Sequence, residues 1–576
     1  MASALVRHPT RAMFRGATNT MARFGNNNKL QLEARRSLTH SSSTRNYVQT
    51  ATRPVSAYAA YDSQVYGEMA SHSLNNDKIS NDHEMATSIG QQHPKIDMSF
   101  NDTQLAFHSK TLSQLIRSYL VFLTCSSNLI VSHNERLMRL SRNILGARAF
   151  KALMRYTYYG QFVAGEDEHE IKPIIDHLHS FGVKTILDYS AEEDVTNEGD
   201  CTSAEGAGEQ QQVACDRRTE TRKYASLART YFYKGESHCE RNMETFLGSL
   251  DAVAHSTNHT GFAAIKLTAL GRPQLLMKLS RCVEATRQAR PQHDQTCIED
   301  ALRTPGVDAL SEDEAEMLHN MMRRVNKIAY HAQQLNARCM IDAEQTYLQP
   351  AINLITLQLM QRYNTRAAIV FNTYQCYLRN AFASVCRDLD LAKRYGFYFG
   401  AKLVRGAYMD QERARAAKLN YPDPINETYE ATSAQYERTL AYLMHEIVAA
   451  GANSNDPQRR LISIMVASHN EQAIRFAVAQ MRALNIRPEH RVVCFGQLYG
   501  MCDHVSFTLG QSGYSVYKYL PYGPVEEVLP YLSRRAAENH GILAKLQRER
   551  SLHLTEIANR IKQFKFFYKP VGQRTI

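Results

Sequence analysis

Short apolar runs alternate with amphipathic stretches from residue 183 towards the end of the chain. The runs are rich in β-branched and aromatic residues, and most are apolar at successive positions, which is typical of parallel strands buried on both faces. We expect eight strands, at residues 185–190, 263–269, 338–345, 367–375, 399–409, 461–468, 491–498 and 516–523. Eight strands that alternate with helices predict an α/β fold, a closed (β/α)8 barrel of the TIM type. An open doubly wound sheet is the alternative for the same alternation.

The segments outside the strands differ in their patterns. Residues 108–182 have a mostly helical pattern and precede the barrel, which we assign to residues 183–576. Residues 49–107 are polar with little apolar periodicity, which predicts a poorly ordered arm. Within the barrel, residues 191–222 and 285–315 are polar and turn-rich, so we expect them to be solvated insertions.

Positive charge is concentrated at the N-terminus. The chain has a formal net charge of +11, and residues 1–48 contain seven arginines and one lysine against one glutamate. This segment is also rich in serine and threonine and lacks a continuous apolar run, which is typical of a mitochondrial transit peptide. A disordered basic tail that binds an acidic partner is the alternative. Because so much of the charge lies here, the folded part is not expected to bind nucleic acid.

Other motifs narrow the class of protein. The most apolar window, Tyr119–Val131, is 13 residues long and interrupted by polar ones. A bilayer core of about 30 Å needs a longer helix, so we expect any membrane association to be peripheral. The 11 cysteines include no pair at CxxC spacing, and no GxGxxG or GxxxxGK[ST] motif occurs. Neither a zinc site nor a Rossmann or P-loop phosphate turn is indicated.

Polar side chains stand at the carboxyl ends of nearly all predicted strands, where barrel enzymes collect their functional groups. These positions are Lys266, Asp342, Glu344, Gln375, Lys402, Arg405, Ser468, His469, Gln497, Tyr519 and Tyr522. Asp342 and Glu344 are two residues apart, so we expect them on one face of the third strand. Taken singly, Asp342 could be a helix N-cap, His469 a core histidine and Tyr519 a packing aromatic. Together these residues predict one electropositive mouth, suited to an anionic substrate and a phosphate-bearing cofactor.

A pair of arginines, Arg534 and Arg535, follows the last predicted strand. On a helix the two project about 100° apart, and Glu538 lies one turn beyond both, where it can orient them. Two guanidinium groups held in this way can bind a carboxylate bidentately, which lysines do less well. A solvated arginine face is the alternative, but the adjacent strand end at 518–523 favours a binding role.

Three segments of the chain resemble the proline dehydrogenase family in their order and spacing. They are 341–352 (IDAEQTYLQPAI), 402–408 (KLVRGAY) and 519–539 (YLPYGPVEEVLPYLSRRAAEN). The similarity runs over roughly residues 110–550, and it is greater to the monofunctional mitochondrial branch than to the bifunctional bacterial one.

The resemblance implies that FAD lies across the carboxyl ends of the strands. Asp342 and Lys402 would be catalytic: Asp342 would support the site by hydrogen-bonding Lys266 or a tyrosine, and Lys402 would lie near the reactive face of the flavin. The implied substrate site consists of Lys266, Tyr519, Arg534 and Arg535, with the arginines on the carboxylate. The implied cofactor site consists of Ala343, Gln375, Lys402, Arg405, Gly406, Ala407, Ser468, His469 and Glu538. Bacterial members generally carry arginine in place of Lys402 and lysine in place of Arg405, so the donor geometry near the flavin differs here.

The activity implied by the resemblance is hydride transfer from C5 of L-proline to N5 of the flavin, giving 1-pyrroline-5-carboxylate. Electrons would pass to a quinone, and the enzyme would associate peripherally with the matrix side of the inner mitochondrial membrane. A hydroxyproline dehydrogenase of the same fold is the nearest alternative; bulky Tyr519 favours proline because it would crowd a ring hydroxyl. A catalytically inactive mitochondrial binding protein is a further alternative, but a scaffold would not need the charged groups of the mouth.

Overall fold

The fold is a closed barrel of eight parallel strands in the order β1 to β8. The computed structural model describes residues 96–127, 130, 133–190, 235–257, 259–290, 297–303, 310–451, 460–533 and 543–572. The strands are β1 Val183–Tyr189, β2 Phe262–Ile265, β3 Arg338–Ile341, β4 Val370–Gln375, β5 Phe399–Val404, β6 Ile462–Ala467, β7 Val493–Leu498 and β8 Val516–Tyr522. Each strand pairs in parallel with its neighbour in sequence, and β1 closes the barrel by pairing with β8. The predicted barrel is confirmed, and the open-sheet alternative is wrong.

Several strands are shorter than predicted at their carboxyl ends. β2 ends at Ile265 because Lys266 leads into a 3-10 turn at Leu267–Ala269. β3 likewise ends at Ile341. The residues that follow these two strands are therefore loop residues, and the two-residue alternation of a strand does not apply to them.

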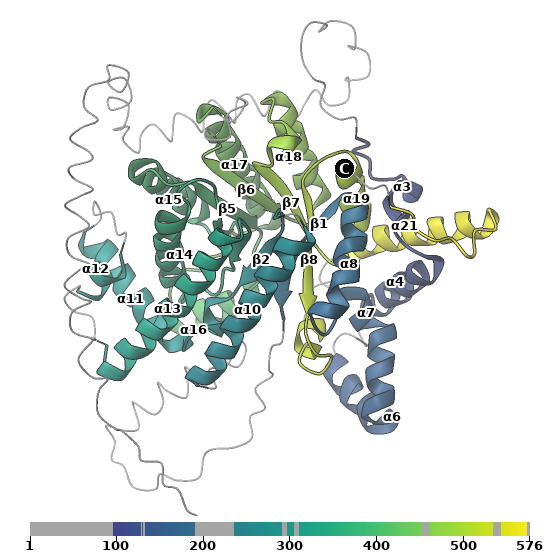
Figure 1. Ribbon diagram of the computed structural model, residues 1–576, viewed down its shortest axis with the longest axis horizontal. Coiled ribbons are helices and arrows are strands. Elements are labelled where there is room, and N and C mark those ends of the chain that lie inside the picture. The colour runs from purple at the N-terminus through teal and green to yellow at the C-terminus, as the bar shows by residue number, and fades with distance from the viewer. Residues whose placement is uncertain are drawn as a thin grey trace, which may run out of the picture. The chain divides into compact units, whose positions relative to one another are not determined.

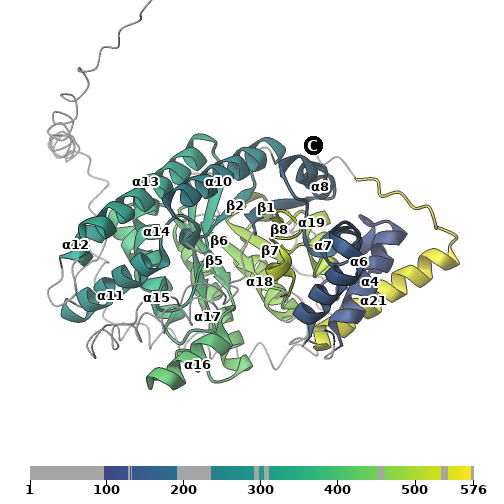
Figure 2. The ribbon, with the colours of Figure 1, turned by 90° about the horizontal axis from the view of Figure 1, so that it is seen from below.

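A ring of helices surrounds the strands (Figures 1 and 2). The helices between the strands are α10 Glu236–Ser256, α11 Pro273–Ala289, α12 Ile298–Leu302, α13 Glu312–Gln334, α14 Gln349–Tyr363, α15 Ala381–Tyr395, α16 Met409–Leu419, α17 Tyr429–Ala449, α18 Glu471–Ala483 and α19 Asp503–Gln511. The insertion expected at 285–315 contains α12, the end of α11 and the start of α13, while the one expected at 191–222 lies outside the described residues.

The inside of the barrel is filled by large side chains that alternate along the strands. Ile186, Phe262, Met340 and Tyr517 belong to one buried cluster, together with Phe371. The Phe262 ring meets the rings of Phe371 and Tyr517 edge-on, at centroid distances of 5.2 and 4.9 Å. The barrel is thus closed below its mouth by a packed core, as is usual for this fold.

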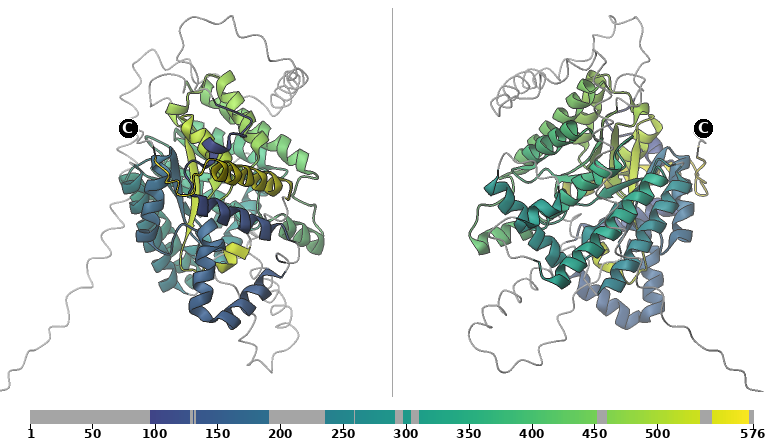
Figure 3. Two further views of the ribbon diagram at one scale, coloured as in Figure 1. Left: turned by 90° about the vertical axis from the view of Figure 1, so that its right-hand side faces the viewer. Right: turned by 60° about the vertical axis from the view of Figure 1, so that its left-hand side comes forward.

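Helices from the two ends of the chain lie together on one side of the barrel (Figure 3). They are α3 Thr103–Phe107, α4 Leu112–Cys125, α6 Asn134–Tyr156, α7 Tyr158–Phe162, α8 Glu168–Ser180 and the C-terminal α21 Leu543–Lys562. Phe107 and Leu115 pack against Leu552 and Ile557 of α21. The arm expected at 49–107 is therefore folded in its last part, where Phe107 is fully buried; its earlier part and residues 1–48 lie outside the description. Of the described helices, none is long and apolar enough to cross a membrane.

Candidate active site

Five polar side chains from different strands meet at the carboxyl end of the barrel. They are Asp188 of β1, Lys266 after β2, Asp342 after β3, Lys402 of β5 and Tyr519 of β8. Tyr519 lies two residues beyond the core residue Tyr517 of β8, and Asp188 two beyond Ile186 of β1. Because inward positions recur every second residue, they form the next layer above the apolar core.

Asp342 is the centre of this layer. Its Oδ1 lies 2.7 Å from the Lys402 ammonium, and its Oδ2 accepts a hydrogen bond from the Tyr519 hydroxyl at 3.0 Å. The Lys402 ammonium also stands 5.2 Å from the centre of the Tyr519 ring. Burial, reinforced by the Asp188 and Asp342 carboxylates, holds the pKa of Tyr519 well above its usual range. The hydroxyl therefore stays neutral and donates, and the three side chains orient one another.

Lys266 is neutralised by a different acid. Its ammonium lies 3.3 Å from Oδ1 of Asp188, and the Ser190 hydroxyl donates to the other oxygen of Asp188. Of the two partners expected for Asp342, the tyrosine is therefore present, while Lys266 pairs with Asp188. Asp188 was not among the residues predicted from the sequence. The available signal was an acid in an apolar strand next to a strand that ends in a lone lysine.

Glu344 does not share a strand face with Asp342, contrary to expectation, because β3 ends before either residue. Its side chain is buried and accepts a hydrogen bond from Thr268 Oγ1 at 2.9 Å. Burial raises the pKa of Glu344 to about 8, so this carboxyl is largely protonated at neutral pH. The Gln375 amide donates to the Glu344 carbonyl at 2.8 Å, which ties the end of β4 to the same loop. Next to Glu344, Ala343 is partly buried at the edge of the mouth.

The residues after β5 form a second part of the rim. The Arg405 guanidinium lies 4.1 Å from the Tyr429 ring and donates to Ser433 Oγ at 3.1 Å, which fastens it to the start of α17. Gly406 has a φ of 137°, and a Cβ there would lie 2.3 Å from the ring of Tyr377. Only glycine fits this position, because the conformation and the close ring both exclude a side chain. Ala407 beside it is exposed.

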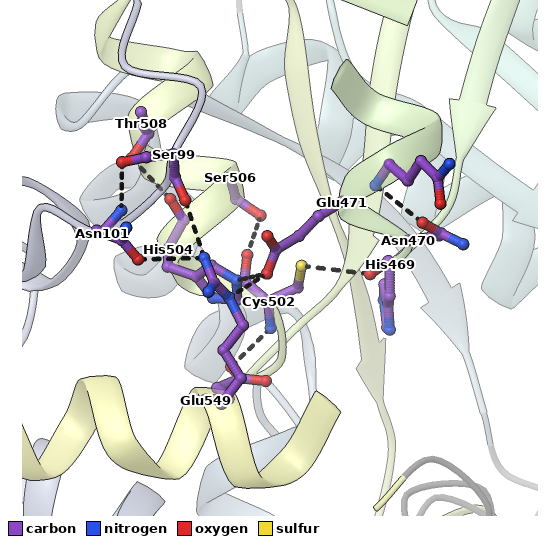
Figure 4. A network of polar contacts seen from close by, with 12 residues as sticks. Ser99, Asn101, His469, Asn470, Glu471, Cys502, His504, Ser506, Thr508 and Glu549 are labelled. Atoms are coloured by element: carbon purple, nitrogen blue, oxygen red, sulfur yellow. Dashed lines mark hydrogen bonds and ion pairs between the residues drawn. The ribbon is translucent and has the colours of Figure 1, made fainter. Parts of the chain in front are cut away.

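The rim after β6 is held in a defined geometry (Figure 4). The Leu498 N–H donates to His469 Nε2 at 2.8 Å, so the ring proton of His469 resides on Nδ1, which is a donor. Ser468 Oγ accepts from the N–H of Asn470 at 3.1 Å. Asn470 then caps α18 by accepting from the N–H groups of residues 472 and 473. Gln497 lies behind this turn, donating to the Ser468 carbonyl at 3.3 Å.

Tyr522, expected at the mouth, points elsewhere. It lies three residues after Tyr519 and so on the opposite face of β8, where its hydroxyl is 2.6 Å from Ser249 Oγ of α10. Arg534, Arg535 and Glu538 lie outside the described residues. The segment just before them packs Tyr531 and other apolar residues against the N-terminal helices.

The family profile described as "Proline dehydrogenase" matches residues 174–548. The chain belongs to the proline dehydrogenase family. Proline dehydrogenase 1, mitochondrial, of Drosophila melanogaster is 46% identical over 84% of this chain and 83% of that protein, and the Homo sapiens protein of the same name is 39% identical over 84% and 93%. The hydroxyproline dehydrogenase of Xenopus laevis is 37% identical over 81% of this chain and 90% of that protein.

The barrel fold also occurs in a solved structure. Proline utilization A from Bdellovibrio bacteriovorus, inactivated by N-propargylglycine, superposes with a TM-score of 0.50 at 17% identity, covering 77% of this chain and 38% of that one. This likeness shows the barrel fold. The family resemblance expected from the three sequence segments is thus confirmed, as is the expected enzyme class.

Proposed function

We propose that this enzyme oxidises L-proline to 1-pyrroline-5-carboxylate with FAD as its cofactor. The observation that carries the proposal is the contact of Asp342 with both the Lys402 ammonium and the Tyr519 hydroxyl at the barrel mouth. Membership of the family supports it, and so do the relatives named proline dehydrogenase at up to 46% identity. A binding scaffold would not need a largely buried ion pair, because burying charges destabilises the fold.

The donors around the mouth suit a flavin. Lys402 and the Nδ1–H of His469 can donate to the acceptor atoms of its ring system, and Lys266 adds positive charge for anionic groups. The space above Gly406 is kept free of a side chain by its own geometry. Ala343, Gln375, Arg405, Ala407, Ser468 and Glu538 complete the set that we propose for cofactor binding. When bound, FAD supplies an acceptor at N5 for the hydride that leaves proline C5.

The chain's own residues position the substrate. Lys266 attracts the substrate carboxylate, and Arg534 and Arg535 are proposed to bind it bidentately. Tyr519 forms one wall beside the pyrrolidine ring, and its hydroxyl is fixed by Asp342. Because the Asp342–Lys402 pair keeps this wall in place, C5 of proline can be held in one orientation. Such positioning lowers the barrier to hydride transfer.

The position of Tyr519 beside the substrate ring also favours proline over hydroxyproline. A ring hydroxyl would need both space and a partner next to Tyr519, whose hydroxyl already donates to Asp342. The relatives named hydroxyproline dehydrogenase are also less similar to this chain than the Drosophila melanogaster proline dehydrogenase is. Hydroxyproline dehydrogenase is retained as the second candidate.

We also propose that the enzyme works at the matrix side of the inner mitochondrial membrane and passes its electrons to a quinone. Its relatives are named as mitochondrial proteins, and residues 1–48 have the composition of a transit peptide. Large apolar side chains are exposed on α4 and α6, among them Leu120 at 52% and Ile144 at 73%. Exposed arginines accompany them on α6, so the surface suits an anionic bilayer.

A flavin spectrum recorded under anaerobic conditions tests the activity. The purified protein is expected to be yellow, and L-proline is expected to bleach the flavin band within the mixing time. trans-4-Hydroxy-L-proline at the same concentration should bleach it far more slowly. A colourless protein that cannot be reconstituted with FAD would overturn the proposal, and faster bleaching by hydroxyproline would establish the second candidate.

A further inference from the structure

A cavity separate from the mouth lies outside the barrel wall, between the N-terminal helices and the β7–β8 side. Its volume is about 320 Å³, and it is bounded by α4, α7, α8, α19 and β8. Its walls include the polar side chains of Lys110, Arg117, Gln161, His177, Asp503 and Lys518. It is separate from the layer around Asp342, because Lys518 points to the outer face of β8 while Tyr519 points inwards.

The cavity walls hold more positive than negative charge. Lys518 is fully buried, and its ammonium lies 2.7 Å from one oxygen of Asp503, while the Lys110 ammonium lies 2.5 Å from the other. Burial alone would raise the pKa of Asp503, but the charges of Lys110 and Lys518 hold it well below its usual range. The buried Lys518 ammonium and the partly buried Lys110 ammonium thus share one carboxylate. Burial raises the pKa of the next acid, Glu549.

Arg117 adds a third cation to the same walls. Its Nε is buried without a hydrogen-bond partner, and its guanidinium forms no ion pair within the described part of the chain. Burial lowers the pKa of the Arg117 guanidinium. Buried charge that is not paired destabilises a protein, and an anion in the cavity would relieve it.

Leu498 connects the cavity to the mouth. The Lys518 ammonium donates to the Leu498 carbonyl at 3.3 Å, and the N–H of Leu498 donates to His469 Nε2 at 2.8 Å. On the other side, Gln161 donates to the Gly500 carbonyl at 2.6 Å. Movement of Lys518 towards a ligand would therefore shift Leu498 and, through it, His469 at the rim after β6.

We propose that this cavity binds a small dianion bearing carboxylate or phosphate groups, and that its occupancy shifts the position of His469. Lys110, Arg117 and Lys518 would bind the anion, and the volume admits a small organic acid or inorganic phosphate but not a nucleotide. The effect on catalysis rests on the proposed function of the mouth, whereas the binding itself does not.

Calorimetric titration of the flavin-loaded full chain tests the binding. Succinate and inorganic phosphate are the two probes, and sodium chloride at equal ionic strength is the blank. One or both probes should bind saturably, and a thermal melt should show a raised Tm in their presence. The probe that binds identifies the source of the anion. Arg117→Gln should weaken binding by about 10-fold or more, while Arg117→Lys should restore most of it. Arg139→Gln, on the exposed face of α6, is the matched control and should bind as the wild type does.

Competition with L-proline separates the cavity from the mouth, which also attracts carboxylates. Cavity binding should survive saturating L-proline and should perturb the flavin absorbance in the wild type but not in Arg117→Gln. Displacement by L-proline with no effect of Arg117→Gln would overturn the proposal, as would equal effects of succinate, phosphate and chloride. Saturable, Arg117-dependent binding in a protein that does not oxidise proline would leave this site standing and reject the proposed function instead.

Discussion

The carboxylate of Asp342 lies 2.7 Å from the Lys402 ammonium and accepts the hydroxyl of Tyr519 through its other oxygen. Asp342→Asn removes the charge that neutralises Lys402 but preserves the shape of the side chain. We expect kcat/KM for L-proline to fall by about 100-fold, about 3 kcal/mol, because a partly buried ion pair is broken. Steady-state kinetics on the flavin-loaded protein measure the change.

Asp410→Asn is the matched control for this variant. Asp410 is exposed on α16, and its substitution should leave kcat/KM within about two-fold of the wild type. Equal activities of Asp342→Asn and the wild type would contradict the central role given to Asp342.

Tyr519 is predicted to select between proline and hydroxyproline. Tyr519→Ser opens space beside the substrate ring and supplies a small hydroxyl, so the ratio of kcat/KM for hydroxyproline to that for proline should rise by about 10-fold. Activity on proline itself should fall, because the Asp342 hydrogen bond is lost. Tyr156→Ser, at an exposed position of α6, should leave the ratio unchanged. A constant ratio in Tyr519→Ser would place the selector elsewhere.

Most residues of the inward layer of the mouth could be predicted from the sequence, because polar side chains at the carboxyl ends of apolar runs are visible in it. Lys266, Asp342, Lys402 and Tyr519 were all identified in this way. Asp188 was missed because a single acid in an apolar strand was not matched to the lysine of the neighbouring strand, with which it pairs. That match depends on β1 and β2 being adjacent, which the predicted barrel already implied.

Other features depend on structure that the sequence pattern does not reveal. Tyr522 was grouped with Tyr519 although their odd spacing places them on opposite faces of β8. The ion pairs of Lys518 with Asp503 require α19 to pack on the outer face of that strand, which is a tertiary contact. Glu344 was placed by strand alternation, which fails because β3 ends at Ile341.

Arg534 and Arg535 are predicted to bind the substrate carboxylate. Arg534→Met or Arg535→Met should raise KM for L-proline by about 30-fold or more, about 2 kcal/mol, because a bidentate charged contact is lost. Flavin content, read from the absorbance spectrum, should be unchanged. Arg366→Met, at an exposed position before β4, serves as the control. Flavin loss with an unchanged KM would assign the pair to the cofactor instead.

Membrane association is predicted to depend on α4 and α6. Leu120→Ser combined with Ile144→Ser should weaken binding to phosphatidylcholine vesicles that contain an anionic lipid by about 10-fold, because exposed apolar side chains no longer insert. Co-sedimentation with the vesicles measures the bound fraction. Leu419→Ser, which removes an exposed leucine on α16, should have no effect. An equal loss of vesicle binding in the double variant and in Leu419→Ser would show that the α4 and α6 surface is not specific.

Glu471 is predicted to stabilise the fold in a pH-dependent way. It accepts from His504 at 3.0 Å and from Arg548 of α21 at 2.7 Å (Figure 4). Burial alone would raise its pKa, but the His504 hydrogen bond and the neighbouring positive charges outweigh burial and lower the pKa to about 2.

The effect of Glu471 on stability follows from this lowered pKa. A lowered folded-state pKa stabilises the protein above the unfolded pKa of about 4.3, and this stabilisation is lost as pH falls towards 2. Glu471→Gln should therefore reduce the free energy of unfolding by about 2 to 3 kcal/mol at pH 7, and by progressively less between pH 4 and pH 2. Urea unfolding at several pH values measures this difference, and Glu489→Gln, at an exposed position, should show none. A difference that is constant from pH 7 to pH 2.5 would show that Glu471 acts through packing rather than through its charge.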